Sequence, residues 1–304
     1  MFAGFEQRRV ATSGAEIALR RKGHGPPLLL LHGYPQTSAI WHAVAPALAE
    51  RFTVVCADLR GYGESGKPTS DPAHRTYAKR AMAQDMVEVM AALGFESFMV
   101  AGHDRGGRVA HRLCLDHPGR VLRAAVLDIV PTRTVFLATN QAIATGYYHW
   151  FFLIQPEPMP ERMIGADPRY YLRHALGQWS AAKGTEWVAP AALAEYERCF
   201  AEPAAIHASC EDYRAAATVD LSDDAGDQDR RIACPLLVLW GEQGLMHQHF
   251  DVLATWRDKA AGTVAGTALP CGHYLPEECP AGVTASFSEF FGGPEAAGRD
   301  SVAS

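Results

Sequence analysis

The stretch Val100-Ala101-Gly102-His103-Asp104-Arg105-Gly106-Gly107-Arg108-Val109 decides the fold. An apolar run, residues 97–101, leads into a turn flanked by glycines, and a helical pattern follows over about residues 105–117. This order predicts a nucleophile elbow, in which a strained turn between a strand and a helix presents one side chain above a sheet. The flanking glycines lack the Cβ atoms that would collide as the chain reverses. Asp104 stands at the nucleophile position, so the sequence predicts a carboxylate nucleophile.

A carboxylate nucleophile restricts the chemistry. Attack on an acyl carbon would form an anhydride, which gains little, whereas attack on an sp³ carbon with a leaving group forms an ester that water can hydrolyse. Dehalogenation and epoxide opening are the two reactions that fit. Asp104 has another interpretation, as a cap for the following helix, because aspartate is common at that position. Its place between glycines, directly after a buried strand, favours the nucleophile.

Composition places the chain among globular proteins. It has 304 residues, 48% hydrophobic and 20% charged, with a net charge of −6 that gives no hint of a nucleic-acid or anionic-membrane partner. No apolar run approaches the length of a membrane span, and residues 1–10 do not resemble a signal peptide. The seven cysteines are scattered and form no CxxC pair, so we expect reduced thiols and a cytoplasmic protein.

Buried strands and helical segments alternate along most of the chain. A hairpin around Ser13-Gly14 is followed by apolar runs at residues 27–31, 52–57, 97–101, 121–128, 235–240 and 266–269, with helices predicted over 39–49 and 78–93. This order predicts an α/β protein with a mostly parallel central sheet and helices on both faces.

One long segment interrupts this alternation. From Pro131 to about Arg231 no buried strand is predicted, and the segment is helical and rich in aromatic residues. We therefore expect a core made of residues 1–130 and 232–292 and a helical cap made of residues 131–231, which would lie over the site as a lid. Residues 293–304 are small and polar, and we expect them to be a flexible tail.

Four motifs together resemble the α/β-hydrolase fold over about residues 5–292. They are His32-Gly33-Tyr34-Pro35, Asp58-Leu59-Arg60-Gly61-Tyr62-Gly63, the Asp104 elbow and Gly272-His273. The fold has three groups with an aspartate nucleophile: haloalkane dehalogenases, epoxide hydrolases and fluoroacetate (haloacetate) dehalogenases. The first two typically carry tryptophan after the nucleophile, where this chain has Arg105. The third is similar here in residues 103–108, Leu127-Asp128-Ile129-Val130-Pro131, His149-Trp150 and Asp212-Tyr213-Arg214.

The predicted base is His273, which follows the last strand at the position of the hydrolase histidine and titrates near neutrality. Asp128 is the predicted acid that orients it. Many such enzymes carry the acid after the following strand, but Gly244 stands there. Glu242, two residues too early, is the alternative acid, and Asp128 could also be only a turn residue.

Arg105 and Arg108 lie three residues apart at the start of a helix and therefore share a face. Paired guanidiniums beside a helix amino end form a strong carboxylate site, although such a pair on its own is often solvated surface. Directly after the nucleophile, they predict a small anionic substrate, a 2-haloacid. A neutral substrate would leave buried charge unpaired, which costs about 3–5 kcal/mol.

The resemblance implies further roles. His149, Trp150 and Tyr213 would hold the departing halide, unless these aromatic residues only pack within the lid. The backbone amides of Tyr34 and Arg105 would bind the oxyanion during ester hydrolysis. Trp179 either borders the entrance or packs.

The sequence favours a haloacetate dehalogenase that needs no metal and no cofactor, since His247 and His249 alone are weak evidence for a metal site. An epoxide hydrolase is the alternative, since a lid tyrosine such as Tyr213 could protonate an epoxide oxygen. A binding protein that reuses the fold is the third hypothesis. Resemblance to the family also implies a homodimer.

Overall fold

The computed structural model describes residues 1–293 of the chain. The tail expected over residues 293–304 therefore lies, apart from its first residue, outside the described part. Among the helices of residues 1–293, none combines the length and the apolar character that crossing a bilayer requires. All seven cysteines are free.

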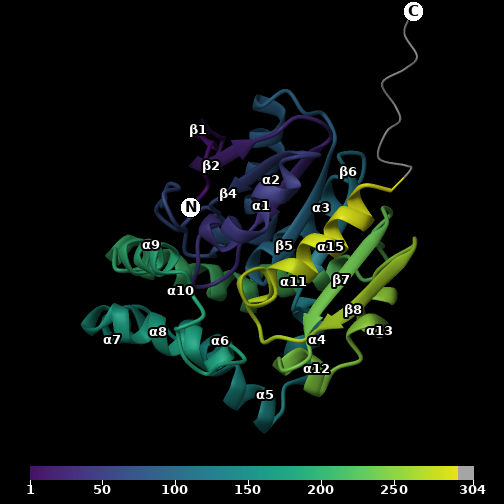
Figure 1. The fold of residues 1–304 in the computed structure, drawn as a ribbon. Coiled ribbons are helices and arrows are strands. Elements are labelled where there is room, and N and C mark those ends of the chain that lie inside the picture. Colours follow the sequence, from purple (N-terminus) through teal and green to yellow (C-terminus); the bar gives the residue numbers. More distant parts are fainter. Residues whose placement is uncertain (294–304) are drawn as a thin grey trace, which may run out of the picture.

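Eight strands form one mostly parallel sheet in the order β1-β2-β4-β3-β5-β6-β7-β8, which confirms the predicted α/β class (Figure 1). The hairpin strands β1 and β2 are antiparallel to each other, β2 is antiparallel to β4, and the remaining neighbours are parallel. The strands are β1 (Glu6–Ala11), β2 (Glu16–Lys22), β3 (Pro27–Leu31), β4 (Thr53–Ala57), β5 (Phe98–His103), β6 (Val121–Leu127), β7 (Leu236–Gly241) and β8 (Val264–Leu269).

The central strands are apolar on both faces because helices cover both faces. In β3, Leu29 and Leu31 join one hydrophobic cluster, whereas Leu28 and Leu30 join the other, as the two-residue period of a strand requires. The first cluster includes side chains of α2 (Lys79–Ala92), α3 (Arg105–Asp116) and α13 (Val252–Arg257). The second includes side chains of the 3₁₀ helix η1 (Ser38–Ala43), α1 (Ala45–Leu48), α14 (Leu275–Glu278) and α15 (Pro280–Phe291).

The helix predicted over residues 39–49 is wrong as a single element. The structure has the 3₁₀ helix η1 and then the short helix α1, separated at Val44. Pro46 lies in the first turn of α1. Since proline has no N–H, it cannot donate to a carbonyl four residues earlier, and a continuous α-helix through this point would lose that bond.

The chain between β6 and β7 contains helices and no strand. Most of them gather beside the end of the sheet, in teal and green (Figure 1). The helices are α4 (Thr132–Ala138), α5 (Gln141–Gly146), α6 (Tyr148–Leu153), α7 (Met159–Ala166), α8 (Pro168–Trp179), α9 (Pro190–Phe200), α10 (Pro203–Ala217) and α11 (Val219–Gly226). The short helices η2 (Arg75–Tyr77) and α12 (Leu245–His249) complete the described elements.

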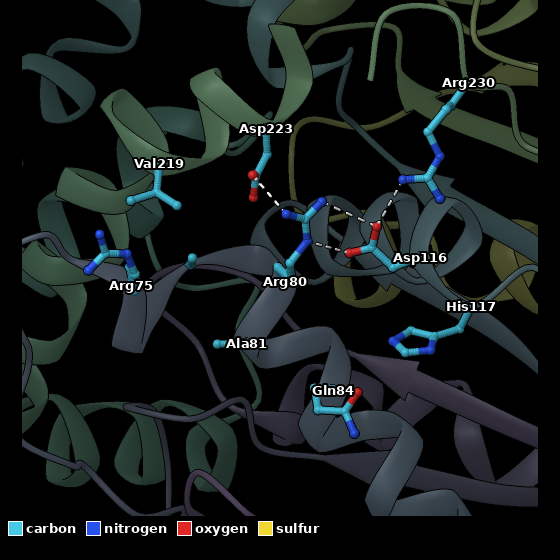
Figure 2. Close-up of a pocket in the computed structure, with 10 residues that line it drawn as sticks. Arg75, Arg80, Ala81, Gln84, Asp116, His117, Val219, Asp223 and Arg230 are labelled. Atoms are coloured by element: carbon cyan, nitrogen blue, oxygen red, sulfur yellow. Dashed lines mark hydrogen bonds and ion pairs between the residues drawn. The ribbon is translucent and has the colours of Figure 1, made fainter. Parts of the chain in front are cut away.

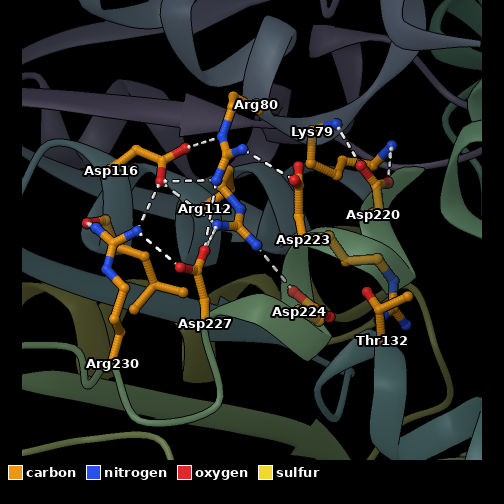
Figure 3. A network of polar contacts seen from close by, with 12 residues as sticks. Lys79, Arg80, Arg112, Asp116, Thr132, Asp220, Asp223, Asp224, Asp227 and Arg230 are labelled. Carbon is orange, nitrogen blue, oxygen red and sulfur yellow. Dashed lines mark hydrogen bonds and ion pairs between the residues drawn. The ribbon is translucent and has the colours of Figure 1, made fainter.

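An ion-pair network fastens α11 to α2 and α3 (Figures 2 and 3). Arg80 of α2 bridges Asp116 and Asp223 at 2.8 and 2.9 Å. Arg112 of α3 donates to Asp224 at 2.9 Å and also pairs with Asp227. The groove in Figure 2 is lined in part by Arg80, Asp116 and Asp223 of this network, and Asp104 is not among its lining residues.

We expect Arg112→Gln to lower the free energy of unfolding by about 3 kcal/mol, because the Arg112 side chain is only 4% exposed, Asp224 would lose its cation and Asp227 would keep only its pairs with Arg80 and Arg230. Arg120→Gln is the matched control, since Arg120 pairs with the 84% exposed Glu96, and it should cost less than about 1 kcal/mol. Urea denaturation measures both variants. Equal, small effects would show that the buried network does not stabilise the attachment of α11.

Candidate active site

Asp104 lies on a strained turn between β5 and α3. Its backbone has φ 45° and ψ −112°, a conformation that non-glycine residues rarely adopt. Glycines make the turn possible: a Cβ at Gly33 would lie 2.5 Å from the Asp104 Cβ, and one at Gly102 would lie 2.2 Å from the carbonyl oxygen of Gly106. Although Asp104 occupies the N-cap position of α3, its side chain makes no capping hydrogen bond. The capping interpretation is therefore wrong.

The Asp104 carboxylate is buried and ionised. Its Oδ2 accepts a hydrogen bond from the backbone N–H of Tyr34 at 3.0 Å, and the residue is 7% exposed. Burial by itself raises the pKa of this carboxyl, but the nearby charges of His273, Arg105 and Arg108 outweigh it and hold the pKa below its ordinary value. The side chain is thus a carboxylate at neutral pH.

His273 and Asp128 meet beside the elbow, although they lie 145 residues apart in the sequence. The two atoms His273 Nδ1 and Asp128 Oδ2 are 2.6 Å apart. Burial lowers the pKa of His273, but the hydrogen bond and charge of Asp128, with the charge of Asp104, raise it overall above the ordinary value. Asp128 also accepts from the N–H of Gly241 at 2.9 Å, which fixes its carboxylate at the end of β7.

The alternative acid does not take part in this pair. Glu242 is exposed to solvent, whereas Asp128 contacts the imidazole. A Cβ at Gly244 would lie 3.2 Å from Asp128 Oδ1. Position 244, the other position expected to carry the acid, therefore lies beside the carboxylate of Asp128. Its glycine leaves room for that carboxylate.

Arg105 is anchored rather than free. Its guanidinium is fully buried and donates to both carboxylate oxygens of Asp212, at 2.9 Å from Nε and 2.6 Å from Nη2. Asp212 also accepts from Tyr62 Oη at 2.7 Å and pairs with Lys79. The Arg105 Nη1 group alone has no partner in residues 1–293. Sequence reasoning missed this pairing, which neutralises much of the charge of Arg105.

Arg108 is a buried cation to which no acidic side chain of residues 1–293 is bound. It is 3% exposed, and its Nη1 donates only to the carbonyl of Val130 at 3.1 Å and the hydroxyl of Thr132 at 3.0 Å. Its Nε has no partner in the described part of the chain. Burial and the charge of Arg105 lower the pKa of Arg108, although Asp104 opposes that shift. Arg108 is therefore a site that an anion would stabilise.

Aromatic side chains from α6 and α10 close over this pair of cations. The guanidinium of Arg108 lies 4.7 Å from the ring centroid of Trp150, and that of Arg105 lies 4.2 Å from that of Tyr213. The His149 ring lies 5.4 Å from the Tyr213 ring. The three residues predicted to hold the halide thus lie together. Burial lowers the pKa of His149 well below its ordinary value, so its imidazole is neutral.

Polar atoms of these aromatic residues are buried without partners in residues 1–293. They include the hydroxyl of Tyr213 and the Nδ1 of His149. The Tyr34 ring lies 5.2 Å from the Tyr213 ring and is stacked on His149 at 5.8 Å. Sequence reasoning considered only the backbone of Tyr34 and missed its side chain. Since unpaired buried polar groups are costly, these atoms would bind water or a polar ligand.

Trp179 lies between His149 and His273, and His103 contacts the loop of His273. The Trp179 ring is 4.2 Å from the His149 ring and 6.2 Å from the His273 ring, and its Nε1 donates to the carbonyl of Gly146 at 3.1 Å. His103, which sequence reasoning missed, places its Nε2 2.8 Å from the carbonyl oxygen of His273. Burial lowers the pKa of His103 to about 3, so it is neutral and donates this bond.

No cluster of three metal-ligating side chains occurs among residues 1–293. His247, half of the His-x-His pair noted in the sequence, accepts a hydrogen bond at its Nδ1 from the Trp240 indole at 3.0 Å.

An aspartate on a nucleophile elbow, a histidine–aspartate pair and a mostly parallel sheet define the class of α/β hydrolases. The model of the α/β-hydrolase fold family matches residues 26–278. A solved structure of an α/β hydrolase from Nostoc sp. PCC 7120 superimposes with a TM-score of 0.94 at 58% identity, covering 96% of this chain and 99% of that one.

Two curated relatives narrow this class. A fluoroacetate dehalogenase from Burkholderia sp. is 47% identical over 290 residues, 95% of each chain. A soluble epoxide hydrolase from Corynebacterium sp. strain C12 is 33% identical over 274 residues, 88% of this chain and 91% of that one. The chain belongs to the α/β-hydrolase family, in the group of members that includes the fluoroacetate dehalogenase.

We expect Asp212→Asn to lower the free energy of unfolding by about 3–5 kcal/mol, because Arg105 and Lys79 would be left buried without their shared anion. The thermal midpoint should fall by several degrees. Calorimetry at neutral pH measures this change, with Glu289→Gln, an exposed site on α15, as the control. An unchanged midpoint would mean that the carboxylate does not hold the two cations.

Proposed function

We propose that this protein hydrolyses the carbon–halogen bond of a small 2-haloacid, converting a haloacetate and water into glycolate, halide and a proton. The dehalogenase named among its relatives supports this reaction, and a hydrolase is the class that the family establishes. One observation carries the proposal: within residues 1–293, Arg108 is a buried guanidinium without an acidic partner, one helical turn from the predicted nucleophile. A substrate carboxylate supplies the missing anion.

In the first step the carboxylate of Asp104 attacks the α-carbon, and the electron pair of the carbon–halogen bond leaves with the halide. Arg108 and the free Nη1 group of Arg105 bind the substrate carboxylate and reduce its repulsion with Asp104. His149, Trp150 and Tyr213, which lie beside the two guanidiniums, would act as donors for the developing halide. Donors help a poor leaving group because they interact most strongly when its charge develops.

In the second step His273 removes a proton from water, and the hydroxide attacks the ester carbonyl of Asp104. The backbone amides of Tyr34 and Arg105 stabilise the oxyanion, and the alkoxide of glycolate leaves with the proton from His273. The charge of Asp104 contributes to the raised pKa of His273. Since forming the ester removes that charge, the pKa of His273 falls when it must act as a base.

A single turnover in water enriched in ¹⁸O tests the reaction. The protein is mixed in excess with fluoroacetate or chloroacetate, released halide is measured, and the peptide that contains Asp104 is weighed. We expect halide release and one ¹⁸O atom in Asp104, because water attacks the carbonyl of the ester and not the α-carbon. Halide release with an unlabelled Asp104 would rule out the ester, and no release would rule out the proposed function.

Epoxide hydrolysis is the second candidate. The buried hydroxyl of Tyr213 has no partner in the described chain and would be free to donate to an epoxide oxygen, and a named relative is an epoxide hydrolase. The same Asp104 would attack a ring carbon. Turnover of neutral epoxides that survives Arg108→Ala would favour this function over dehalogenation, since an epoxide gives Arg108 no anion to bind.

Arg108→Met is expected to separate activity from stability. Removing a buried cation that lacks an acidic partner should leave the thermal midpoint unchanged or raise it. The kcat/KM for a haloacetate should fall about 10²–10³-fold, because a charge-assisted contact with the substrate is lost. Thermal unfolding and steady-state halide release measure the two effects. A large drop in the midpoint with near-normal kcat/KM would assign Arg108 to the fold instead.

Asp128→Asn is expected to shift the pH dependence. His273 must be neutral to act as a base, so the rate of ester hydrolysis falls as the pH drops through its pKa. Asp128 raises that pKa through its hydrogen bond and charge, so the variant should have its acidic limb at lower pH. Its kcat should also fall about 10²–10⁴-fold, since the imidazole loses its orienting partner. A limb that stays in place or moves to higher pH would contradict the assigned pairing.

A further inference from the structure

The carboxylate of Glu278, at the end of α14, accepts hydrogen bonds from the backbone of the loop that carries His273. Its Oε2 accepts the backbone N–H of Gly272 at 3.0 Å, and its Oε1 accepts the N–H of Tyr274 at 2.8 Å. These are the residues directly before and after His273. One side chain therefore fixes the backbone on both sides of the predicted base.

The same carboxylate reaches the segment that follows α8. Glu278 Oε2 also accepts the N–H of Ala181 at 2.8 Å. Beside it, the N–H of His273 donates to the carbonyl of Trp179 at 3.0 Å. The two backbones approach so closely that a Cβ at Gly272 would lie 2.4 Å from the nitrogen of Ala181. The loop of His273 and the end of α8 thus form one packed unit joined by Glu278.

This unit connects the predicted base with the aromatic side chains around His149. The Trp179 ring, at its edge, lies 4.2 Å from the His149 ring, and His103 holds the carbonyl of His273 from the other side. Asp128 fixes only Nδ1 of the imidazole, whereas the position of its Nε2 depends on where the backbone of residue 273 lies. A carboxylate is well suited to this task, because its two oxygens can together accept hydrogen bonds from the three backbone amides.

We propose that Glu278 is a positioning residue for the hydrolysis of the ester, acting through His273. The proposal rests on the proposed function, because it assumes two chemical steps at Asp104. In the proposed first step, ester formation uses Asp104, Arg105, Arg108 and the halide donors His149, Trp150 and Tyr213, and none of the hydrogen bonds that Glu278 makes within residues 1–293 reaches these residues. Loss of the Glu278 carboxylate therefore slows the second step and spares the first.

Glu278→Gln tests this assignment, because glutamine keeps the shape and one acceptor oxygen but turns an N–H₂ group toward the remaining amides. Rapid mixing with chloroacetate follows halide release, and quenched samples are analysed for the ester on the Asp104 peptide. We expect a burst of about one halide per site at a rate within about threefold of the wild type. Steady-state kcat should fall about 10²-fold, as displacement of a catalytic group by about 1 Å can cause, and the ester should accumulate.

Two further variants complete the experiment. Glu289→Gln removes an exposed carboxylate from α15 and should match the wild type in both phases. Glu278→Ala should show the same split as Glu278→Gln, with a larger fall in kcat. Circular dichroism and the thermal midpoint establish that each variant is folded.

The outcomes are distinct. A burst rate that falls as much as kcat, an unchanged kcat, or no accumulated ester in folded Glu278→Gln overturns the assignment to Glu278 and leaves the proposed function standing. Failure of both Glu278 variants to fold also overturns it, since the contacts would then serve the fold. A wild-type protein that releases no halide overturns the proposed function and this inference with it.

Discussion

The structure depends on keeping a carboxylate ionised inside the protein. Asp104 is nearly buried, which raises its pKa, and only the positive charge around it restores the ionised form. Part of this positive charge comes from neighbouring residues, since Arg105 and Arg108 follow Asp104 within about one turn of α3. The same charge would let a second carboxylate, that of a substrate, approach the first. Without it, two anions would repel each other at the point where a bond must form.

The two arginines divide this task. Arg105 is locked by Asp212, which is itself held by Lys79 and Tyr62, so its position is fixed and its charge largely balanced. Arg108 has carbonyl and hydroxyl partners only, and its charge is left for a ligand. A fully balanced pair would bind no anion, and a fully unbalanced pair would cost the fold several kcal/mol. The observed division provides both a rigid site and an unsatisfied cation.

Much of the fold could be predicted from the sequence because strands buried on both faces are continuous apolar runs, and the Asp104 elbow is defined by neighbouring residues. The contact between Asp128 and His273 could be predicted from the topology. The two residues follow β6 and β8, and the carboxyl ends of parallel strands lie at the same edge of the sheet. The pairing of Arg105 with Asp212 could not be predicted, because it spans 107 residues and depends on how helical segments without strand pairing pack. The break at Pro46 was visible in the sequence and was missed.

The central claim is electrostatic, and a neutral isostere of the substrate tests it most directly. Fluoroacetate and fluoroacetamide have nearly the same size and the same leaving group. Only fluoroacetate carries a negative charge that can pair with Arg108, whose Nη1 donates to a carbonyl and a hydroxyl. Fluoride release from both compounds should be measured with wild-type protein at neutral pH. We predict turnover of fluoroacetate and a kcat/KM for fluoroacetamide at least about 10²-fold lower, the value of a lost charge-assisted contact. Equal turnover of the two compounds would contradict the account.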